Sequence, residues 1–314
     1  MLTYRYIMKY NDTDIIIDEA LLRKIEEKKK RLDSLRPLSK DALKALLADI
    51  RLRHTYHSDA IEGNTLTLQE TKLVLEEGVT IGGKPLKDHI EARNDAEAFD
   101  LMVALASGKK PISQETIQQI HAVVTRGILS SPGQYRIGNV RITGSTIAPP
   151  SYTKIIKLMD EYTHNICTLP LHPIKKAAFV HYELVRIHPF FDGNGRVARL
   201  LSNLFLMQNG YPPIVVKKTD RKKYYQTLKK ADQGDVSDFT QFIAREVHEA
   251  LQYYLSSFVE EERLIPLRKL ASVTRYSQEY LSLRARQGKF DAVKIEDVWY
   301  SSKRALKEYM QSMK

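Results

Sequence analysis

The stretch from His188 to Arg199 gathers the side chains that chemistry on nucleotides requires. His188 can serve as a general base, with an ordinary pKa near ~6.5. Asp192 offers a hard oxygen ligand of the kind that holds Mg²⁺ jointly with phosphates. Arg199 follows Arg196 by three residues, so on a helix both guanidinium groups can point toward one charged group. A base, a metal ligand and paired arginines together indicate phosphoryl or nucleotidyl transfer.

A loop and the helix after it must position these side chains. The apolar spacing predicts a helix from about Gly195 to Gln208, with Asn209-Gly210 as its stop. The unpaired N–H groups and the positive dipole end of that helix would attract an anion. Gly193 and Gly195 would let the backbone approach such a ligand closely. The loop therefore predicts an anion cradle.

Other interpretations of the same loop remain open or fail on spacing. Asp-Gly-Asn-Gly is strong turn chemistry by itself, so a purely structural turn stays open. An EF-hand starting at Asp192 would need Gly at position 197 and Glu at 203, where Val197 and Asn203 stand. A Walker A loop would need a Gly-Lys-Ser/Thr triplet, which does not follow these glycines.

Most of the chain has the periodicity of helices, which predicts a mainly α fold. One apolar helical face leads up to Glu62, where Gly63-Asn64 marks a stop, and another helix is predicted over 173–187 with Pro173 in its first turn. Strand signals are few. Residues 140–143 alternate apolar and polar before the turn residues Gly144-Ser145, which predicts a short hairpin.

The run His188-Pro-Phe-Phe-Asp-Gly-Asn-Gly-Arg-Val-Ala-Arg199 resembles the signature of Fic-domain enzymes at every defining position. The resemblance implies an all-helical catalytic core that moves AMP from ATP onto a hydroxyl group of a target protein and releases pyrophosphate. It also implies that His188 deprotonates the attacking hydroxyl and that Asp192 holds Mg²⁺. Relatives that transfer phosphate have Lys where Gly195 stands, so glycine favours AMP transfer. By the same resemblance, the nucleotide phosphates would be held by Gly193, Asn194, Gly195, Arg196 and Arg199.

A second stretch is similar to the inhibitory motif of the same family. Ser58-Asp-Ala-Ile-Glu62-Gly63 matches (Ser/Thr)-x-x-x-Glu-(Gly/Asn) and precedes the catalytic run. The resemblance implies that Glu62 pairs with Arg199 and occupies the space of the ATP γ-phosphate, so that bound ATP lies in a non-productive pose. The alternative is a helix-end glutamate followed by a glycine stop.

The resemblance extends to a flap and to the adenine side of the pocket. The hairpin would be a flap that holds the target segment by strand addition, and its alternative is a surface hairpin. Aromatic residues at helical spacing are otherwise more often core, and some relatives have Asn in place of the acidic pocket residue. The flap would be Arg141, Ile142, Thr143, Gly144 and Ser145, and the pocket residues would be Tyr224, Tyr225 and Asp232.

The last 50 or so residues resemble winged-helix modules. Between positions 261 and 314 there are 12 basic and 7 acidic residues, a net charge of +5. Arg284 and Arg286 would contact DNA phosphates or base edges, whereas a protein-binding or dimerising module is the alternative. The predicted order is a helix over 266–272, a second capped by Ser277 and ending at Gly288, a hairpin over 293–300 and a last helix capped by Ser302.

Composition bounds the class of protein. The 314 residues carry a formal charge of +11, and 43% are hydrophobic, which excludes a mainly disordered chain. No apolar run approaches the ~18 residues of a membrane helix, no secretory signal is visible, and Cys167 is the single cysteine. We therefore expect a cytoplasmic protein. His54, His57 and Asp59 have no apparent fourth ligand, so we do not expect a metal site there.

The sequence thus predicts a protein adenylyltransferase, restrained by Glu62 and dependent on Mg²⁺. The expected regions are an N-terminal helical part over 1–95, a Fic core over 96–258 and a winged-helix-like domain over 262–314. Expected partners are ATP, a protein target, and possible further ones: the chain itself as a substrate, a second copy, and DNA through 262–314. Two alternatives stay open, namely a hydrolase that removes AMP and a DNA-binding regulator with a Fic sensor domain.

Overall fold

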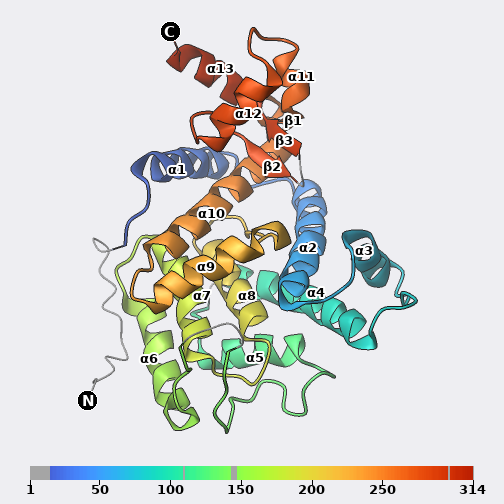
Figure 1. Ribbon diagram of the computed structural model, residues 1–314, viewed down its shortest axis with the longest axis vertical. Helices are drawn as coiled ribbons and strands as arrows, with labels where there is room; N and C mark the ends of the chain where they lie inside the picture. The colour runs from blue at the N-terminus through green and yellow to red at the C-terminus, as the bar shows by residue number, and fades with distance from the viewer. Residues whose placement is uncertain (1–14, 109, 143–146, 296–297, 314) are drawn as a thin grey trace. The chain divides into compact units, whose positions relative to one another are not determined.

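A computed structural model describes residues 15–108, 110–142, 147–295 and 298–313 (Figure 1). The chain forms two compact units. The larger unit is Ala48–Val247 with the beginning of the chain up to Leu22, and the smaller unit is Arg23–Leu47 with His248–Lys314. Three helices contribute residues to both units, namely α1 (Glu19–Ser34), α2 (Lys40–Glu62) and α10 (Ser237–Phe258).

Two consecutive helices, α7 (Pro173–Ile187) and α8 (Asn194–Gln208), form the centre of the larger unit. Both helices confirm the sequence prediction. α7 begins where expected because Pro173 occupies its first turn, and the ring of His172 accepts a hydrogen bond from the Ile174 N–H at 3.3 Å. Most side chains of both helices are buried, which explains why the apolar positions were so dense in the sequence.

The remaining helices of the larger unit pack around this pair, except α3, which packs against α4. α4 packs against α8 and α5, and α6 lies along α7 (Figure 1). Among the described residues, no helix has both the length and the apolarity that crossing a bilayer would require. These remaining helices are α3 (Leu68–Glu76), α4 (Leu86–Ser107), α5 (Gln114–Val124), α6 (Ile155–Thr168) and α9 (Arg221–Asp232), with short 3₁₀ turns at Tyr152–Lys154 and Lys218–Asp220.

The smaller unit contains a three-stranded antiparallel sheet in the order β1-β3-β2. Ser277 and Ser302 cap the helices that follow them, by accepting hydrogen bonds from the N–H groups of Tyr280 (3.2 Å) and Ala305 (3.1 Å). The predicted order of helix, helix, hairpin and helix is confirmed, while the winged-helix assignment stays a prediction. The elements are a 3₁₀ turn at Glu260–Glu262, β1 (Ile265–Pro266), α11 (Leu267–Ala271), α12 (Gln278–Arg286), β2 (Val293–Ile295), β3 (Val298–Ser301) and α13 (Lys303–Ser312).

The predicted flap hairpin is not a hairpin over the residues that the structure describes. Val140, Arg141 and Ile142 are in irregular backbone, and the calls on Thr143, Gly144 and Ser145 fall outside the described residues. The flap therefore stays a prediction.

Candidate active site

The loop between α7 and α8 is shaped by two residues in the left-handed backbone region. His188 ends α7 with φ 51°, and Gly193 precedes α8 with φ 79°. Non-glycine residues adopt this conformation rarely, so the surrounding structure must hold His188 in place. The side chain of Asn194 closes the loop by bonding to both backbone groups of Phe190, at 3.0 Å and 2.9 Å. The predicted tight turn is therefore real, and it also orients the chemical groups.

The His188 ring is oriented by the end of its own helix. Its Nδ1 lies 3.2 Å from the carbonyl oxygen of Val185, and because a carbonyl only accepts, Nδ1 carries the proton. Nε2 is then the basic nitrogen. Burial lowers the pKa of His188 below its ordinary value, while the carboxylates of Glu62 and Asp192 oppose that shift. The imidazole is therefore neutral at pH 7.

His121 supports the same loop from α5, and the sequence analysis missed it. Its ring stacks on Phe190 with centroids 3.6 Å apart. Its Nδ1 accepts a hydrogen bond from the Gly133 N–H (2.9 Å), so its Nε2 donates to the carbonyl of Asp192 (3.1 Å). Burial lowers the pKa of His121 to about 4, which keeps this tautomer neutral. No local motif surrounds His121, so only the fold could reveal it.

Arg136 is a second missed residue, and it ties three backbone segments together. Its buried guanidinium donates to the carbonyls of His188 (2.8 Å), Gly138 (2.8 Å) and Pro150. Its own N–H donates to the carbonyl of Pro189 at 2.9 Å. Arg136 thereby links the loop between α7 and α8 to Gly138 and Pro150, which flank the predicted flap.

Two positions of the loop require glycine, each for a different steric reason. At Gly193 a side chain would be strained by the positive φ, and its Cβ would lie 3.0 Å from the Thr125 methyl group. At Gly195 the backbone is ordinary, but a Cβ would lie 2.4 Å from Oε1 of Glu62. Glycine at position 195 is thus what allows the Glu62 carboxylate to approach the first turn of α8.

Arg199 meets the end of α2 in the contact that the sequence predicted. Its Nη2 lies 2.7 Å from Oε1 of Glu62 and also donates to the Ser58 carbonyl, while its Nε donates to the Ser58 hydroxyl at 3.0 Å. The Arg199 side chain is 2% exposed and that of Glu62 is 32% exposed. Nη1 of Arg199 is buried without a hydrogen-bond partner among the described residues, so one donor near Gly195 is unsatisfied.

Arg196 and Arg199 have different protein partners, and their joint contact with nucleotide phosphates stays a prediction. Nη1 of Arg196 lies 3.0 Å from Oε1 of Glu91 on α4 and 3.9 Å from Asp59, and its Nη2 lies 3.7 Å from Asp192. The difference arises because α8 packs against α4, a neighbour that helical spacing alone cannot identify.

A cavity of about 1100 Å³ opens above these groups. Glu62, His188, Asp192 and the glycine loop line one part of it, and Lys218, Arg221 and Lys222 give its rim a positive charge. The lining also includes Arg141, Ile142, Asn194, Tyr225 and Asp232, all of which the sequence placed at the flap or nucleotide.

Tyr224 does not line this cavity, although the sequence grouped it with Tyr225 and Asp232. It is buried on the inner side of α9, where its hydroxyl bonds to Nε2 of His181 at 2.8 Å. Tyr182, which the sequence analysis did not single out, takes a place in the cavity wall, and its hydroxyl donates to Asp232 at 3.2 Å. One of the two adjacent tyrosines therefore belongs to the core and the other to the cavity.

Asp192, which the sequence analysis expected to hold Mg²⁺, lines the cavity. Its side chain is 48% exposed and lines the cavity, and its Oδ1 accepts the Gly193 N–H at 2.6 Å. A half-exposed carboxylate beside an anion-binding helix start suits a metal ion shared with phosphates. His54 and His57 have different partners. Nε2 of His54 lies 3.7 Å from Oδ2 of Asp95, and Nδ1 of His57 accepts a hydrogen bond from the Lys218 N–H at 3.2 Å.

The arginines proposed for DNA contact differ in their availability. Arg284 donates to the Tyr309 hydroxyl (2.9 Å) and to Gln287 (3.1 Å), so it is committed to the core of the smaller unit. Arg286 is exposed and makes one long bond to the Ser282 carbonyl.

Comparison with known proteins identifies the class. The model of the Fic/DOC family matches residues 111–206, which contain the whole loop and both central helices up to Leu206. The Fic-1 structure from C. elegans is 31% identical, with a TM-score of 0.68 over 76% of this chain and 71% of that one. The chain therefore belongs to the Fic/DOC family.

Further relatives extend the comparison. Protein adenylyltransferase Fic from Nematostella vectensis is 36% identical over 77% of this chain and 57% of its own length, and the one from Drosophila virilis is 35% identical over 80% and 52%. The chain thus spans about half the length of these curated relatives. A Fic family protein from Desulfovibrio desulfuricans G20, at 23% identity and a TM-score of 0.66, shares the fold over 93% of this chain.

Proposed function

We propose that this protein transfers AMP from ATP to a hydroxyl group of a protein and that its own α2 restrains the reaction. The observation that carries the proposal is the convergence, on one cavity, of a neutral histidine, an anion-attracting helix start and a glutamate paired with the arginine of that helix. The curated relatives named protein adenylyltransferase Fic support the same reaction.

His188 acts as the base in this proposal. Its Nε2 takes the proton of the target hydroxyl as the oxygen attacks the α-phosphorus of ATP, and the bond from that phosphorus to the bridging oxygen breaks to release pyrophosphate. The lowered pKa keeps Nε2 unprotonated at neutral pH. The bond from Nδ1 to Val185 and the stacking of His121 on Phe190 hold the ring and its loop in a fixed position.

The start of α8 and its arginines bind the phosphates. Gly193 and Gly195 carry no side chain over the start of α8, and the unsatisfied Nη1 of Arg199 is a donor without a partner among the described residues. Mg²⁺ bound by Asp192 would neutralise charge on the phosphates as pyrophosphate leaves. Tyr225 and Asp232 would lie toward the adenine, and the segment that begins at Arg141 would hold the target.

Glu62 restrains the enzyme by occupying Arg199. The carboxylate sits 2.7 Å from Nη2 and within 2.4 Å of where a Cβ on Gly195 would lie, so it takes space and charge that an outer phosphate needs. ATP would then bind with its phosphates displaced. Removing the carboxylate frees a buried guanidinium for the nucleotide, and AMP transfer should rise.

Intact-mass spectrometry of the purified protein with MgATP tests both claims. We expect the Glu62→Gly variant to gain the mass of one or more AMP groups on itself or on an added target, at a rate at least tenfold above the wild type. The variant Glu97→Gly is a matched control, because Glu97 is an exposed glutamate on α4 that pairs with Arg126, away from Arg199. Equal rates for wild type and Glu62→Gly would refute the restraint, and labelling by a His188→Ala variant would refute the assigned base.

Removal of AMP from a modified target is a second candidate function. The Glu62 carboxylate lines the same cavity as His188 and is partly exposed, so it is placed to orient a water molecule. Incubating a pre-modified target with wild type and with Glu62→Gly separates the two directions. Faster AMP release by the wild type than by the variant would favour removal.

A further inference from the structure

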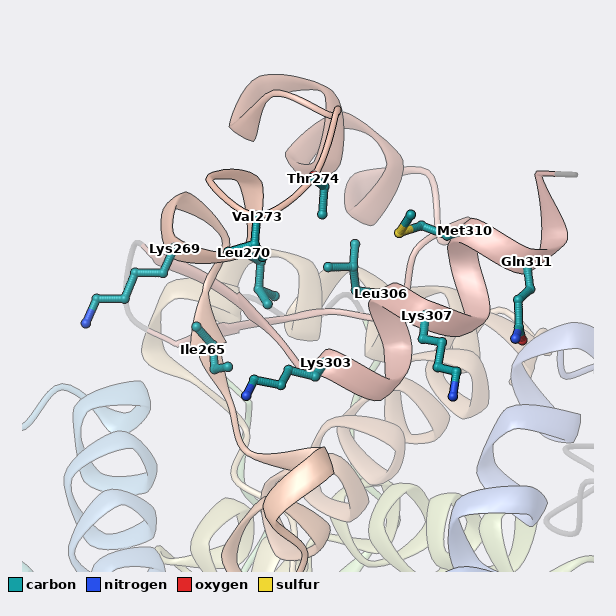
Figure 2. A pocket seen from close by; sticks show the side chains of 10 residues that line it. All are labelled: Ile265, Lys269, Leu270, Val273, Thr274, Lys303, Leu306, Lys307, Met310 and Gln311. Atoms are coloured by element: carbon teal, nitrogen blue, oxygen red, sulfur yellow. The ribbon is translucent and has the colours of Figure 1, made fainter.

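The smaller unit has an apolar groove with a basic border, far in sequence from the catalytic loop (Figure 2). It has a volume of about 620 Å³ and lies between α11 and α13, beside β1. We call it the α11–α13 groove. It is lined by Ile265, Lys269, Leu270, Val273, Thr274, Lys303, Leu306, Lys307, Met310 and Gln311.

The floor of the α11–α13 groove belongs to the core, whereas its walls project into solvent. Leu270 and Leu306 are 2% and 6% exposed and continue the hydrophobic cluster of the unit. Val273 is 75% exposed and Met310 is 39% exposed, which is a large exposure for apolar side chains. This apolar surface is anchored in the core and open to solvent, so an apolar side chain of another molecule can pack on it.

The charged residues that line the groove are basic. They are Lys269, Lys303 and Lys307, and no aspartate or glutamate among the described residues lines it. Figure 2 shows Lys303 and Lys307, one turn apart on α13, on the side of the groove opposite Thr274. In the part of the chain that the structure describes, none of the three lysines has an ion-pair partner, although Arg304 on the same helix pairs with Glu308 at 2.8 Å.

We infer that the α11–α13 groove binds a short amphipathic helix of another protein, one that carries carboxylates beside its apolar stripe. Apolar side chains of that helix would cover Leu270, Val273, Leu306 and Met310, and Met310 can adapt its shape to the ligand. Lys303 and Lys307 at i, i+4 match carboxylates at the same spacing on a partner helix. This interaction does not depend on the proposed AMP transfer.

Protein is favoured over nucleic acid by the composition of the groove. Five of the ten lining residues are aliphatic or methionine. Their side chains have no hydrogen-bond donor or positive charge for a sugar-phosphate backbone. The cations are lysines and not arginines, so the planar fork that reads phosphates and guanine edges is missing from the lining. Apolar anchors with a charged border are instead the usual anatomy of a protein interface.

Fluorescence anisotropy with the full chain tests the inference. The probe is a fluorescein-labelled, end-capped peptide of about 14 residues with Leu at i, i+3, i+4 and i+7 and Glu at most other positions. We expect saturable binding to the wild type and at least tenfold weaker binding to Lys303→Glu/Lys307→Glu. A matched charge reversal outside the groove, Arg286→Glu/Lys289→Glu, should leave the affinity within about twofold.

A second variant separates groove binding from simple charge attraction. Val273→Asp places a carboxylate on an exposed wall without touching the core, so it should weaken the peptide at least fivefold with an unchanged melting temperature. No saturable binding to the wild type at low salt, or equal loss in both charge reversals, would overturn the inference.

The same variants test two other possible occupants of the α11–α13 groove, namely a second copy of this chain and duplex DNA. If light scattering shows that the wild type is a dimer and Lys303→Glu/Lys307→Glu a monomer, the groove is a self-association surface and the inference is wrong. If duplex DNA binds more tightly than the peptide and Val273→Asp does not weaken it, the groove is a nucleic-acid site and the inference is equally wrong.

Discussion

Gly195 and Glu62 are coupled through a single close approach. A methyl group at position 195 would lie 2.4 Å from Oε1 of Glu62, and the flexible carboxylate is the group that can move. We expect Gly195→Ala to push Glu62 away from Arg199 and to lower the free energy of unfolding by about 1–3 kcal/mol. In a Glu62→Gly background the same substitution should cost less than half as much. Urea unfolding of the four proteins of this double-mutant cycle measures the coupling.

The cycle has a matched control within the same cavity. Asn194→Ala also alters the loop, but its bonds go to Phe190 and not to Glu62, so its cost should be the same in both backgrounds. If Gly195→Ala lowers the free energy of unfolding equally with and without Glu62, the two residues are not energetically coupled.

We predict that the contribution of Arg136 to stability depends on the geometry of its hydrogen bonds and not on its charge alone. Its side chain serves three carbonyls on separate segments, and a lysine in its place can neither reach nor satisfy all three. We expect Arg136→Lys to lower the free energy of unfolding by about 2–4 kcal/mol. Arg93→Lys, at an exposed position of α4, should change it by less than about 0.5 kcal/mol. A cost below about 1 kcal/mol in urea titrations would contradict the tying role.

At the scale of elements, the end of α2 is fastened to α8 by more than one residue. Arg199 donates to the Ser58 hydroxyl and carbonyl as well as to Glu62. Ser58→Ala removes only the hydroxyl contact, worth about 0.5–1.5 kcal/mol, so we expect AMP transfer to rise two- to tenfold, less than for Glu62→Gly. Parallel labelling assays with MgATP measure the order. A Ser58→Ala rate equal to that of wild type would show that the hydroxyl does not support the restraint.

The elements that the sequence could predict are those with local signals. Pro173 in the first turn of α7 and the capping hydroxyls of Ser277 and Ser302 act within three or four residues, so their helices began where expected. Residues 140–142 are not in a strand, because alternation by itself does not identify a strand partner, and the flap stays a prediction. A helical stop at Gly63 was equally local, and its φ of 106° shows why glycine ends α2 there.

At the scale of the whole molecule, the site depends on partners that lie far apart in sequence. Arg199 and Glu62 are 137 residues apart, and a known inhibitory motif was needed to link them. The contact of Arg196 with Glu91 spans 105 residues and no motif announced it. His121 and Arg136 were missed for the same reason. Residue types and spacing can predict the chemistry of the loop, but the fold decides which carboxylate each arginine meets.

Buried histidines make the larger unit sensitive to acid. Burial lowers the pKa of His54 and His181 to about 3 and that of His57 and His121 to about 4, so these rings stay neutral in the folded state. In the unfolded chain they take up protons near pH ~6.5. The unfolded state therefore binds more protons below that pH, and stability falls as the pH decreases.

Two buried carboxyls act in the opposite direction. Burial raises the pKa of Asp95 to about 7 and that of Asp59 well above its ordinary value, so in the folded state they take up protons at a pH where the unfolded chain remains ionised. Their contribution to stability grows as the pH falls toward ~4. Four histidines outnumber two aspartates, and the free energy of unfolding should be lower at pH 5 than at pH 7.

Urea titrations at pH 7 and pH 5 measure this difference, and two variants assign it. Each histidine of folded pKa near 4 or below accounts for about 2 kcal/mol at pH 5, so His121→Gln should shrink the difference between the two pH values by about that amount. Asp95→Asn removes an opposing group whose side-chain oxygens have no hydrogen-bond partner among the described residues, so the difference should widen. An equal urea midpoint at both pH values in the wild type, or a change of the opposite sign in either variant, would mean that these groups are not held in the protonation states that burial favours.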